Sequence, residues 1–232
     1  MIAAALDTSC GTSLAIVRDG HLVLEAQLAL EGRGNDRELV PWLMAELAKA
    51  GTTPGKVRQW TVGTGPGSFS GIRVGIAWIQ GVCLASDADY RGIPSSLAIA
   101  MELFHRQPQA RTAGIFHDGR RRQVILTRFE SQADGIRQIG EPEPLDPAEA
   151  EMALAKLDIA GTVQAPLVLP LFSLDSQSRI TALPAIPARR LLEIPGPFPA
   201  TPADQEASCE PVYVRPPVFV EPKPARPDPI HA

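Results

Sequence analysis

Cysteine and histidine are scarce in this sequence, and their scarcity excludes several classes of protein. The chain of 232 residues has 3 cysteines and 4 histidines. The cysteines are Cys10, Cys83 and Cys209, and the histidines are His21, His105, His117 and His231. The cysteines are too few and too far apart for a disulfide framework or a zinc finger, and the histidines show no metal-ligand spacing. We therefore expect a protein of a reducing compartment without a metal site.

An excess of positive charge is also lacking. The net charge is -4 and the pI is about 5.6, so the chain as a whole has no basic signature for nucleic acid. Any contact with RNA is therefore expected to be local or supplied by a partner. The N-terminus has no basic region and Asp7 interrupts its apolar run, which argues against a signal peptide. No apolar stretch looks both long enough and free enough of charge to span a bilayer, so we expect a soluble cytoplasmic protein.

The most informative stretch of the chain runs from Gly63 to Ala85. A Gly-Pro-Gly turn at 65–67 opens it, and Ser68 or Ser70 can cap the helix predicted at 71–85. Three glycines inside that helix cost about 1 kcal/mol each relative to alanine, so we expect them to serve packing. One face combines Gly71, Gly75, Trp78, Val82 and Ala85. Two interpretations stay open: a central helix of a single core, or a glycine-bearing side that admits a second helix at a subunit interface.

Two parts of the chain share one pattern of strand, polar turn led by an aspartate, strand, Asp-Gly turn and strand. The first has strands at 2–6, 14–17 and 22–28, and the second has strands at 112–116 and 124–129 and a turn at 134–135. Asp7 and Asp118 hold equivalent places. The repeat indicates an α/β protein of two lobes, each a mixed sheet with a β-meander and flanking helices. The expected boundaries are 1–107, 108–215 and a proline-rich tail at 216–232, which we expect to be disordered.

The remaining elements are expected from periodicity, caps and turn residues. Strands are predicted at 57–62, 90–93, 163–171 and 212–214. Helices are predicted from a cap at Asn35 to about Gly51, and at 94–104, 144–156 and 188–194. Pro41 lies inside the first of these helices, so that helix either kinks or starts later than its cap suggests.

Four short motifs carry a family resemblance. They are Leu6-Asp-Thr-Ser9, Gly65-Pro-Gly-Ser-Phe-Ser-Gly-Ile-Arg73, Asp118-Gly-Arg120 and Pro211-Val-Tyr-Val-Arg215. In order and spacing, over about residues 1 to 220, they resemble the TsaB (YeaZ-like) family of the Gcp/TsaD-like superfamily. The resemblance implies a two-lobed actin/Hsp70-like (ASKHA) fold. It also implies a non-catalytic subunit that pairs with the catalytic paralogue TsaD and, through it, with the ATPase TsaE. That complex transfers threonylcarbamoyl from threonylcarbamoyl-AMP to N6 of the adenosine 3' of the tRNA anticodon.

The same resemblance implies that the helices after the Asn35 cap and after the Gly-Pro-Gly turn form the dimer, either with the paralogue or with a second copy. The partner-interface residues are then Asn35, Leu39, Leu43, Gly71, Val74, Gly75, Trp78 and Val82. The histidine pair that holds a metal in TsaD-like subunits has no counterpart at 34–39. We therefore expect no catalytic residue, no metal, no required cofactor and no protease activity.

An enzymatic alternative stays open, in which a stand-alone actin-like ATPase or kinase binds Mg-ATP or ADP between the lobes. An aspartate in the first turn would position the magnesium ion, and hydroxyls and glycine amides would hold the phosphates. The residues concerned are Asp7, Thr8, Ser9, Gly11, Thr12, Asp118 and Gly119. The competing interpretation is that these are turn residues whose side chains satisfy their own backbone.

One basic cluster interrupts the acidic average. Arg120, Arg121 and Arg122 are consecutive at the tip of the second hairpin. Either they form a solvated tip, or they contact tRNA phosphates in the assembled complex.

Overall fold

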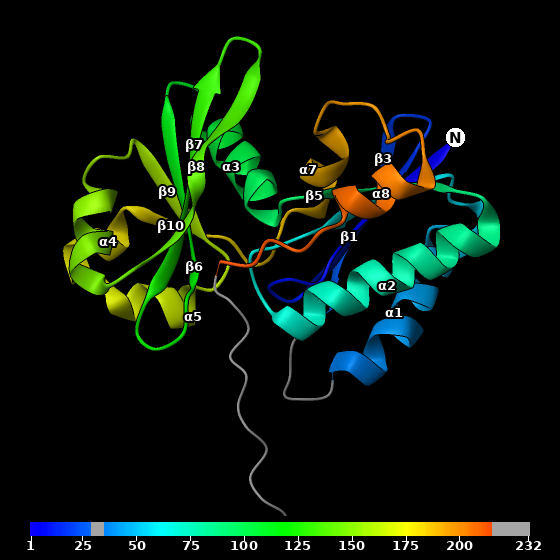
Figure 1. The fold of residues 1–232 in the computed structure, drawn as a ribbon, viewed down its shortest axis with the longest axis horizontal. Helices are drawn as coiled ribbons and strands as arrows, with labels where there is room; N and C mark the ends of the chain where they lie inside the picture. The colour runs from blue at the N-terminus through cyan, green and yellow to red at the C-terminus, as the bar shows by residue number, and fades with distance from the viewer. Residues whose placement is uncertain (29–34, 215–232) are drawn as a thin grey trace, which may run out of the picture.

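The computed structural model describes residues 1–28 and 35–214, which form two lobes, each built on a five-stranded mixed sheet (Figure 1). The strand orders are β3-β2-β1-β4-β5 and β10-β9-β6-β7-β8. In both sheets the first three strands form an antiparallel meander, and two later strands add in parallel beside the first strand of that meander. The shared connectivity confirms the predicted repeat and the two-lobed ASKHA fold.

The strands follow the predicted meanders closely. The first sheet comprises β1 (Ile2–Asp7), β2 (Thr12–Arg18), β3 (His21–Leu28), β4 (Gln59–Gly63) and β5 (Asp89–Ile93). The second comprises β6 (Thr112–Asp118), β7 (Val124–Gln132), β8 (Gly135–Leu145), β9 (Ile159–Thr162) and β10 (Ile180–Ala182). Asp19 and Gly20 both have positive φ, the geometry of a two-residue hairpin turn, and this confirms the turn expected there.

Helices cover both faces of the first sheet (Figure 1). The helices are α1 (Asn35–Lys49), α2 (Phe69–Ser86), α3 (Ser95–Arg106), α4 (Pro147–Leu154), α5 (Ala165–Val168), α6 (Leu174–Ser178), α7 (Ala188–Glu193) and α8 (Pro202–Ser208), with 3₁₀ turns at Pro54–Lys56 and Leu169–Leu171. Side chains of β1 alternate between two cores: Ala4 and Leu6 pack with α1 and α2, whereas Ala5 packs with α3 and α7. A third core lies between the second sheet and α4.

Helix α2 is long, apolar and only partly buried. Ser68 caps it, because its Oγ accepts the Gly71 N–H at 3.2 Å. Its inner side places Ile72, Ile76 and Ile79 in the core of the first lobe. With a mean hydropathy of 1.3 over 18 residues, α2 is apolar enough to cross a membrane by length and composition, contrary to expectation. Only 28% of that window is buried within the chain, although its inner side packs like a helix of a soluble core.

The last described residues return to the first lobe. Helix α7 contacts β1 and β2, helix α8 contacts β5, and the Val212 N–H donates to the Thr64 carbonyl at 2.9 Å. The expected boundary at residue 107 stays a prediction, but residues 188–214 do not pack with the second sheet alone. Arg215 and the expected tail at 216–232 lie outside the described residues.

Several predicted elements need correction. The strand expected at 163–171 is wrong. The strand in this region is β9, which ends at Thr162, and residues 165–171 form α5 and a 3₁₀ turn. Pro166 favours this outcome because proline suits the first turn of a helix. The strand expected at 212–214 is absent from the described residues, where one backbone hydrogen bond to Thr64 stands in its place. The helix expected from residue 144 begins at Pro147, after a capping box formed by Asp146 and Glu149. Elements α6, β10 and α8 were not expected.

Candidate functional site

Four glycines spaced four residues apart leave space for the turn at the end of β1 (residues 7–9) to pack closely against them. We call Gly63, Gly67, Gly71 and Gly75 the glycine ladder. A Cβ built on any of them would lie within 3.0 Å of an atom of the 7–9 turn, closer than real Cβ atoms come. The Thr8 hydroxyl donates to the Gly71 carbonyl at 2.7 Å. The turn therefore sits against the first turns of α2, and the ladder exists to let it approach.

This packing corrects the hypothesis that the glycine-bearing side of α2 admits a second helix. The backbone carbonyl of Thr8 occupies the space beside Gly71, and the Thr8 side chain occupies the space beside Gly75. Gly81 differs from both, since nothing lies within 4 Å of a Cβ built there. The helical periodicity of the sequence correctly assigned Gly71 and Gly75 to one face of α2. It could not show that residues of the same chain cover this face.

The other predicted interface residues are divided between core and surface. Leu39 and Leu43 are buried in the first lobe, so their side chains are not available to a partner, contrary to expectation. Val74, Trp78 and Val82 are partly buried and pack against the same core. Asn35 begins α1, and its side chain lies outside the described part of the structure.

Asp7 is fully buried, and its carboxylate is used within the chain. One oxygen accepts the Ser9 N–H at 2.8 Å and the Ser9 hydroxyl at 2.7 Å, and the other accepts the Ser95 hydroxyl. Burial raises the pKa of Asp7, and the hydrogen bonds from Ser95 and Ser9 oppose that rise. The Asp7 carboxylate therefore does not face the space between the lobes, where a magnesium-binding aspartate would have to point.

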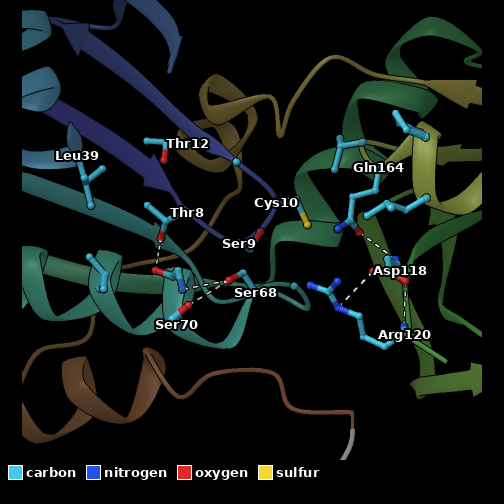
Figure 2. Close-up of a pocket in the computed structure, with 17 residues that line it drawn as sticks. Thr8, Ser9, Cys10, Thr12, Leu39, Ser68, Ser70, Asp118, Arg120 and Gln164 are labelled. Atoms are coloured by element: carbon cyan, nitrogen blue, oxygen red, sulfur yellow. Dashed lines mark hydrogen bonds and ion pairs between the residues drawn. The ribbon is translucent and has the colours of Figure 1, made fainter. Parts of the chain in front are cut away.

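A cleft of about 370 Å³ separates the lobes at this turn (Figure 2). Of the residues expected to bind phosphate, it is lined by Thr8, Ser9, Gly11, Thr12 and Asp118. Gly119 is not among the lining residues, and its N–H donates to the Gln123 carbonyl at 2.9 Å. Two hydroxyls of the cleft are engaged by the chain itself: the Thr8 hydroxyl donates to the Gly71 carbonyl, and the Ser9 hydroxyl donates to the Asp7 carboxylate. The turn-residue interpretation therefore accounts for much of this polar lining.

Cys10 also lines the cleft, with its Sγ 3.6 Å from Nδ1 of His117. Burial, with the nearby charges of Asp7 and Asp118, raises the pKa of the Cys10 thiol to about 12. Burial lowers the pKa of His117 to about 4. At neutral pH both groups are uncharged, so this pair lacks the thiolate that a cysteine nucleophile requires. Within residues 1–28 and 35–214, no three histidine, cysteine, aspartate or glutamate side chains are grouped to hold a metal ion.

The surfaces of α1 and α2 that face away from the first sheet are apolar and exposed. We call this set of residues the outer face: Val40 and Met44 of α1, and Ala77, Gly81, Leu84 and Ala85 of α2. Leu84 is 90% exposed although it lies in the middle of an apolar turn of helix. The two helices lie alongside each other on one side of the first lobe (Figure 1). Extended apolar surface of this kind is a mark of an interaction site.

An exposed group at the start of α2 links two of the sequence motifs. In this aromatic cluster of Phe69, Arg73 and Tyr213, the two rings lie 5.2 Å apart, and the Arg73 guanidinium lies 3.8 Å from the centre of the Phe69 ring. The Arg73 Nε donates to the Tyr213 hydroxyl at 2.8 Å. This contact was not expected from the sequence, because Arg73 and Tyr213 are 140 residues apart and nothing local indicates that they meet.

Residues 119–123, which we call the arginine turn, have an unusual backbone. Arg120, Arg121 and Arg122 have φ of 61°, 51° and 59°, the left-handed region that glycine adopts freely. The conformation costs an L-residue roughly 1 to 2 kcal/mol. All three side chains are exposed, and Arg120 pairs with Asp118 at 3.3 Å. The predicted hairpin tip is therefore confirmed, but in a strained form that the sequence did not indicate.

Comparisons with known proteins agree with this architecture. The family model described as tRNA N6-adenosine threonylcarbamoyltransferase (TsaD) matches residues 32–169. The tRNA threonylcarbamoyladenosine biosynthesis protein TsaB of Escherichia coli is 26% identical over 133 residues, 57% of this chain and 56% of its own length. The protein of the same name from Haemophilus influenzae is 30% identical over 125 residues, 53% of this chain and 52% of its own length. The chain thus spans about half the length of these curated relatives.

Solved structures of low sequence identity share the fold. YeaZ from Pseudomonas aeruginosa superposes with a TM-score of 0.64 at 22% identity, covering 83% of this chain and 89% of its own. An uncharacterized protein similar to peptidase YEAZ, from the same organism, gives a TM-score of 0.68 at 22% identity, covering 92% and 99%. At this identity the likeness establishes the fold.

Proposed function

The chain belongs to the TsaD family, as a TsaB/YeaZ-like member, and on that premise we propose that it is a non-catalytic subunit that pairs with a TsaD-like paralogue. The assembled complex would make N6-threonylcarbamoyladenosine in tRNA, the process named in the descriptions of the TsaB relatives. A TsaE-like ATPase joins through the paralogue, and the complex is cytoplasmic. The proposal needs no cofactor on this chain.

The observation that carries the proposal is the outer face of α1 and α2. Helix α2 is apolar enough to span a membrane, yet only 28% of its apolar window is buried within the chain. Exposed apolar residues on one side of a helix, next to a well-packed inner side, are expected where a second protein completes the burial. Leu84 is the largest side chain that α2 leaves exposed on this face, which makes it the expected anchor.

We favour the role of a subunit that pairs with the paralogue over that of a stand-alone enzyme that binds Mg-ATP. The Asp7 carboxylate is buried and bonded to Ser9 and Ser95, which gives the Mg-ATP alternative no support. A second copy of this chain presents the same outer face, so self-association through it is the natural competing state when the paralogue is absent.

Leu84→Glu is expected to weaken pairing with the paralogue by about 30-fold or more, the effect of losing an anchor worth about 2 kcal/mol. The matched control is Leu174→Glu in α6, since Leu174 is 85% exposed and belongs to the second lobe. Both substitutions fall on exposed side chains, so both variants are expected to keep the wild-type melting temperature. Affinity is measured by gel filtration and by titration of one labelled subunit with the other.

Two outcomes would contradict this assignment. Equal affinity of Leu84→Glu and wild type would show that the outer face is not the docking site. Loss of pairing in Leu174→Glu alone would move the site to the second lobe. If the wild-type chain forms a homodimer that Leu84→Glu dissolves, and no complex with the paralogue forms, the outer face is a self-interface and the proposed partner is wrong.

A further inference from the structure

We infer that the arginine turn and the aromatic cluster together form a contact surface for the unpaired nucleotides of a structured RNA. Both features lie close to the same cleft, and of their own residues Arg120 lines it. Arg120 lines the wall of the second lobe, whereas Ser68 and Ser70, the neighbours of Phe69, line the wall of the first lobe. Figure 2 shows the Arg120 side chain extending across the cleft toward the loop that carries Ser68. One ligand can therefore contact both features.

The charge of this region is opposite to that of the whole chain. The chain carries a net charge of -4, yet no carboxylate among the described residues pairs with Arg121 or Arg122. Arg73 donates to the neutral hydroxyl of Tyr213. Guanidinium groups that lack a carboxylate partner on their own chain remain available to phosphate oxygens, which they bind strongly.

The strained backbone of the arginine turn indicates that its arginine side chains serve a function. Glycine adopts positive φ without strain, whereas here three consecutive arginines do so with their side chains in solvent. The turn is closed by the Gly119 N–H to the Gln123 carbonyl and by the Gln123 N–H to the Arg120 carbonyl. No burial of these side chains offsets the strain, and strain of this kind gathers at functional sites.

The aromatic cluster distinguishes between the polyanions that could bind this surface: unpaired RNA, duplex RNA or an acidic peptide. Phe69 is 47% exposed and Tyr213 is 43% exposed, and the Arg73 guanidinium packs against the Phe69 ring. Exposed rings backed by a guanidinium are the surface on which unpaired bases stack, in loops and single strands. A duplex hides its bases and an acidic peptide has none, so the combination favours an RNA loop with phosphates at the arginine turn.

The proposed RNA-binding surface consists of residues of this chain alone. The inference rests on the proposed function in one respect, that the RNA is a tRNA. The test uses a fluorescently labelled anticodon-type stem–loop RNA, with a fully paired RNA of the same length for comparison. Both are titrated with the full chain and with its complex with the paralogue, over a range of salt concentrations.

The variant Arg121→Gly/Arg122→Gly is expected to bind the stem–loop about tenfold more weakly, with a salt slope reduced by about one for each arginine removed. Its melting temperature is expected to rise by roughly 2 °C or more, because glycine relieves the left-handed strain. The control Arg121→Lys/Arg122→Lys keeps the charge and the strain, so it should retain both binding and wild-type melting. Phe69→Ala is expected to weaken stem–loop binding about tenfold and to leave duplex binding unchanged.

Unchanged affinity and salt slope in the glycine variant would overturn the inference, as would absence of RNA binding by both chain and complex. Equal binding of a poly-glutamate peptide would overturn it as well, because the surface would then be a general anion or protein contact. Pairing with the paralogue is measured on the same samples by gel filtration. A chain that pairs but does not bind RNA refutes this inference alone, and one that binds RNA but does not pair refutes the proposed function alone.

Discussion

Gly71→Ala will destabilise the fold, whereas Gly81→Ala, in the same helix, will stabilise it. At Gly71 a Cβ meets the Thr8 carbonyl oxygen, a backbone atom that cannot move without displacing the turn. Overpacking of this kind costs up to about 3 kcal/mol and outweighs the gain in helix propensity of about 1 kcal/mol. We therefore expect a net loss of about 2 kcal/mol at Gly71. At Gly81 nothing lies within 4 Å, so only the propensity gain of about 1 kcal/mol remains.

Urea unfolding followed by circular dichroism measures both changes against the wild-type chain. Opposite signs are the expected result. If Gly71→Ala stabilised the chain as Gly81→Ala does, the 7–9 turn would not pack against α2 as described. The pair also separates the two roles that the sequence assigned to these glycines. Since Gly71 serves the chain's own packing, the folded fraction of Gly71→Ala should bind the paralogue with wild-type affinity.

Glu102→Gln should have the largest effect on stability of any single substitution considered. Glu102 of α3 is 5% exposed and accepts hydrogen bonds from Arg106, Arg189 and Arg190. Both Arg189 and Arg190 belong to α7, which contacts the first sheet, whereas α3 also packs on strands of the second. A neutral glutamine would leave the buried Arg190 guanidinium with Glu193 as its remaining carboxylate partner. We therefore expect a loss near the lower end of the about 3 to 5 kcal/mol that breaking a buried pair costs.

The matched control is Glu130→Gln, the same substitution in the exposed ion pair with Arg137. A surface pair contributes about 0 to 1 kcal/mol, so this variant should unfold close to wild type. Both free energies of unfolding come from urea titration at neutral pH. Similar values for the two variants would show that the charges of α3 and α7 do not hold the lobes together.

The stability difference between wild type and Glu102→Gln should depend on pH. Burial alone would raise the pKa of Glu102, but the hydrogen bonds from Arg106, Arg190 and Arg189 outweigh it and lower the pKa from 4.5 to about 2. The folded pKa is depressed, so the contribution is complete above about pH 4.5 and is lost as the pH falls toward 2. A shift of this size corresponds to about 3 kcal/mol. A gap that stays constant between pH 6 and about pH 3 would contradict this cause.

Much of the fold could be predicted from the sequence, because its signals are local. The Asp-Gly turns and the Ser68 cap act over a few residues, and each appears in the structure as expected. The repeated order of strands and turns was enough to indicate two lobes. The error at 163–171 arose because a short apolar run with prolines suits a buried strand as well as a helix, and only long-range pairing decides between them.

The candidate site was less predictable, since it depends on contacts between distant segments. Periodicity assigned Gly71 and Gly75 to one face, but the occupant of that face, Thr8, comes from a turn more than 60 residues earlier. The contact of Arg73 with Tyr213 and the exposure of Leu84 depend in the same way on where other segments pack. The signal that could have found Leu84 is its place outside the helix face that carries the isoleucines of α2.

The most direct test of the central claim is hydroxyl-radical footprinting of the chain, alone and with its TsaD-like paralogue. Met44 and Leu84 report on the outer face, and the exposed Met152 and Leu174 of the second lobe serve as references. Oxidation of Met44 and Leu84 is expected to fall when the paralogue is added, whereas oxidation of Met152 and Leu174 is expected to stay the same. A complex seen by gel filtration in which Met44 and Leu84 stay as reactive as before would contradict it.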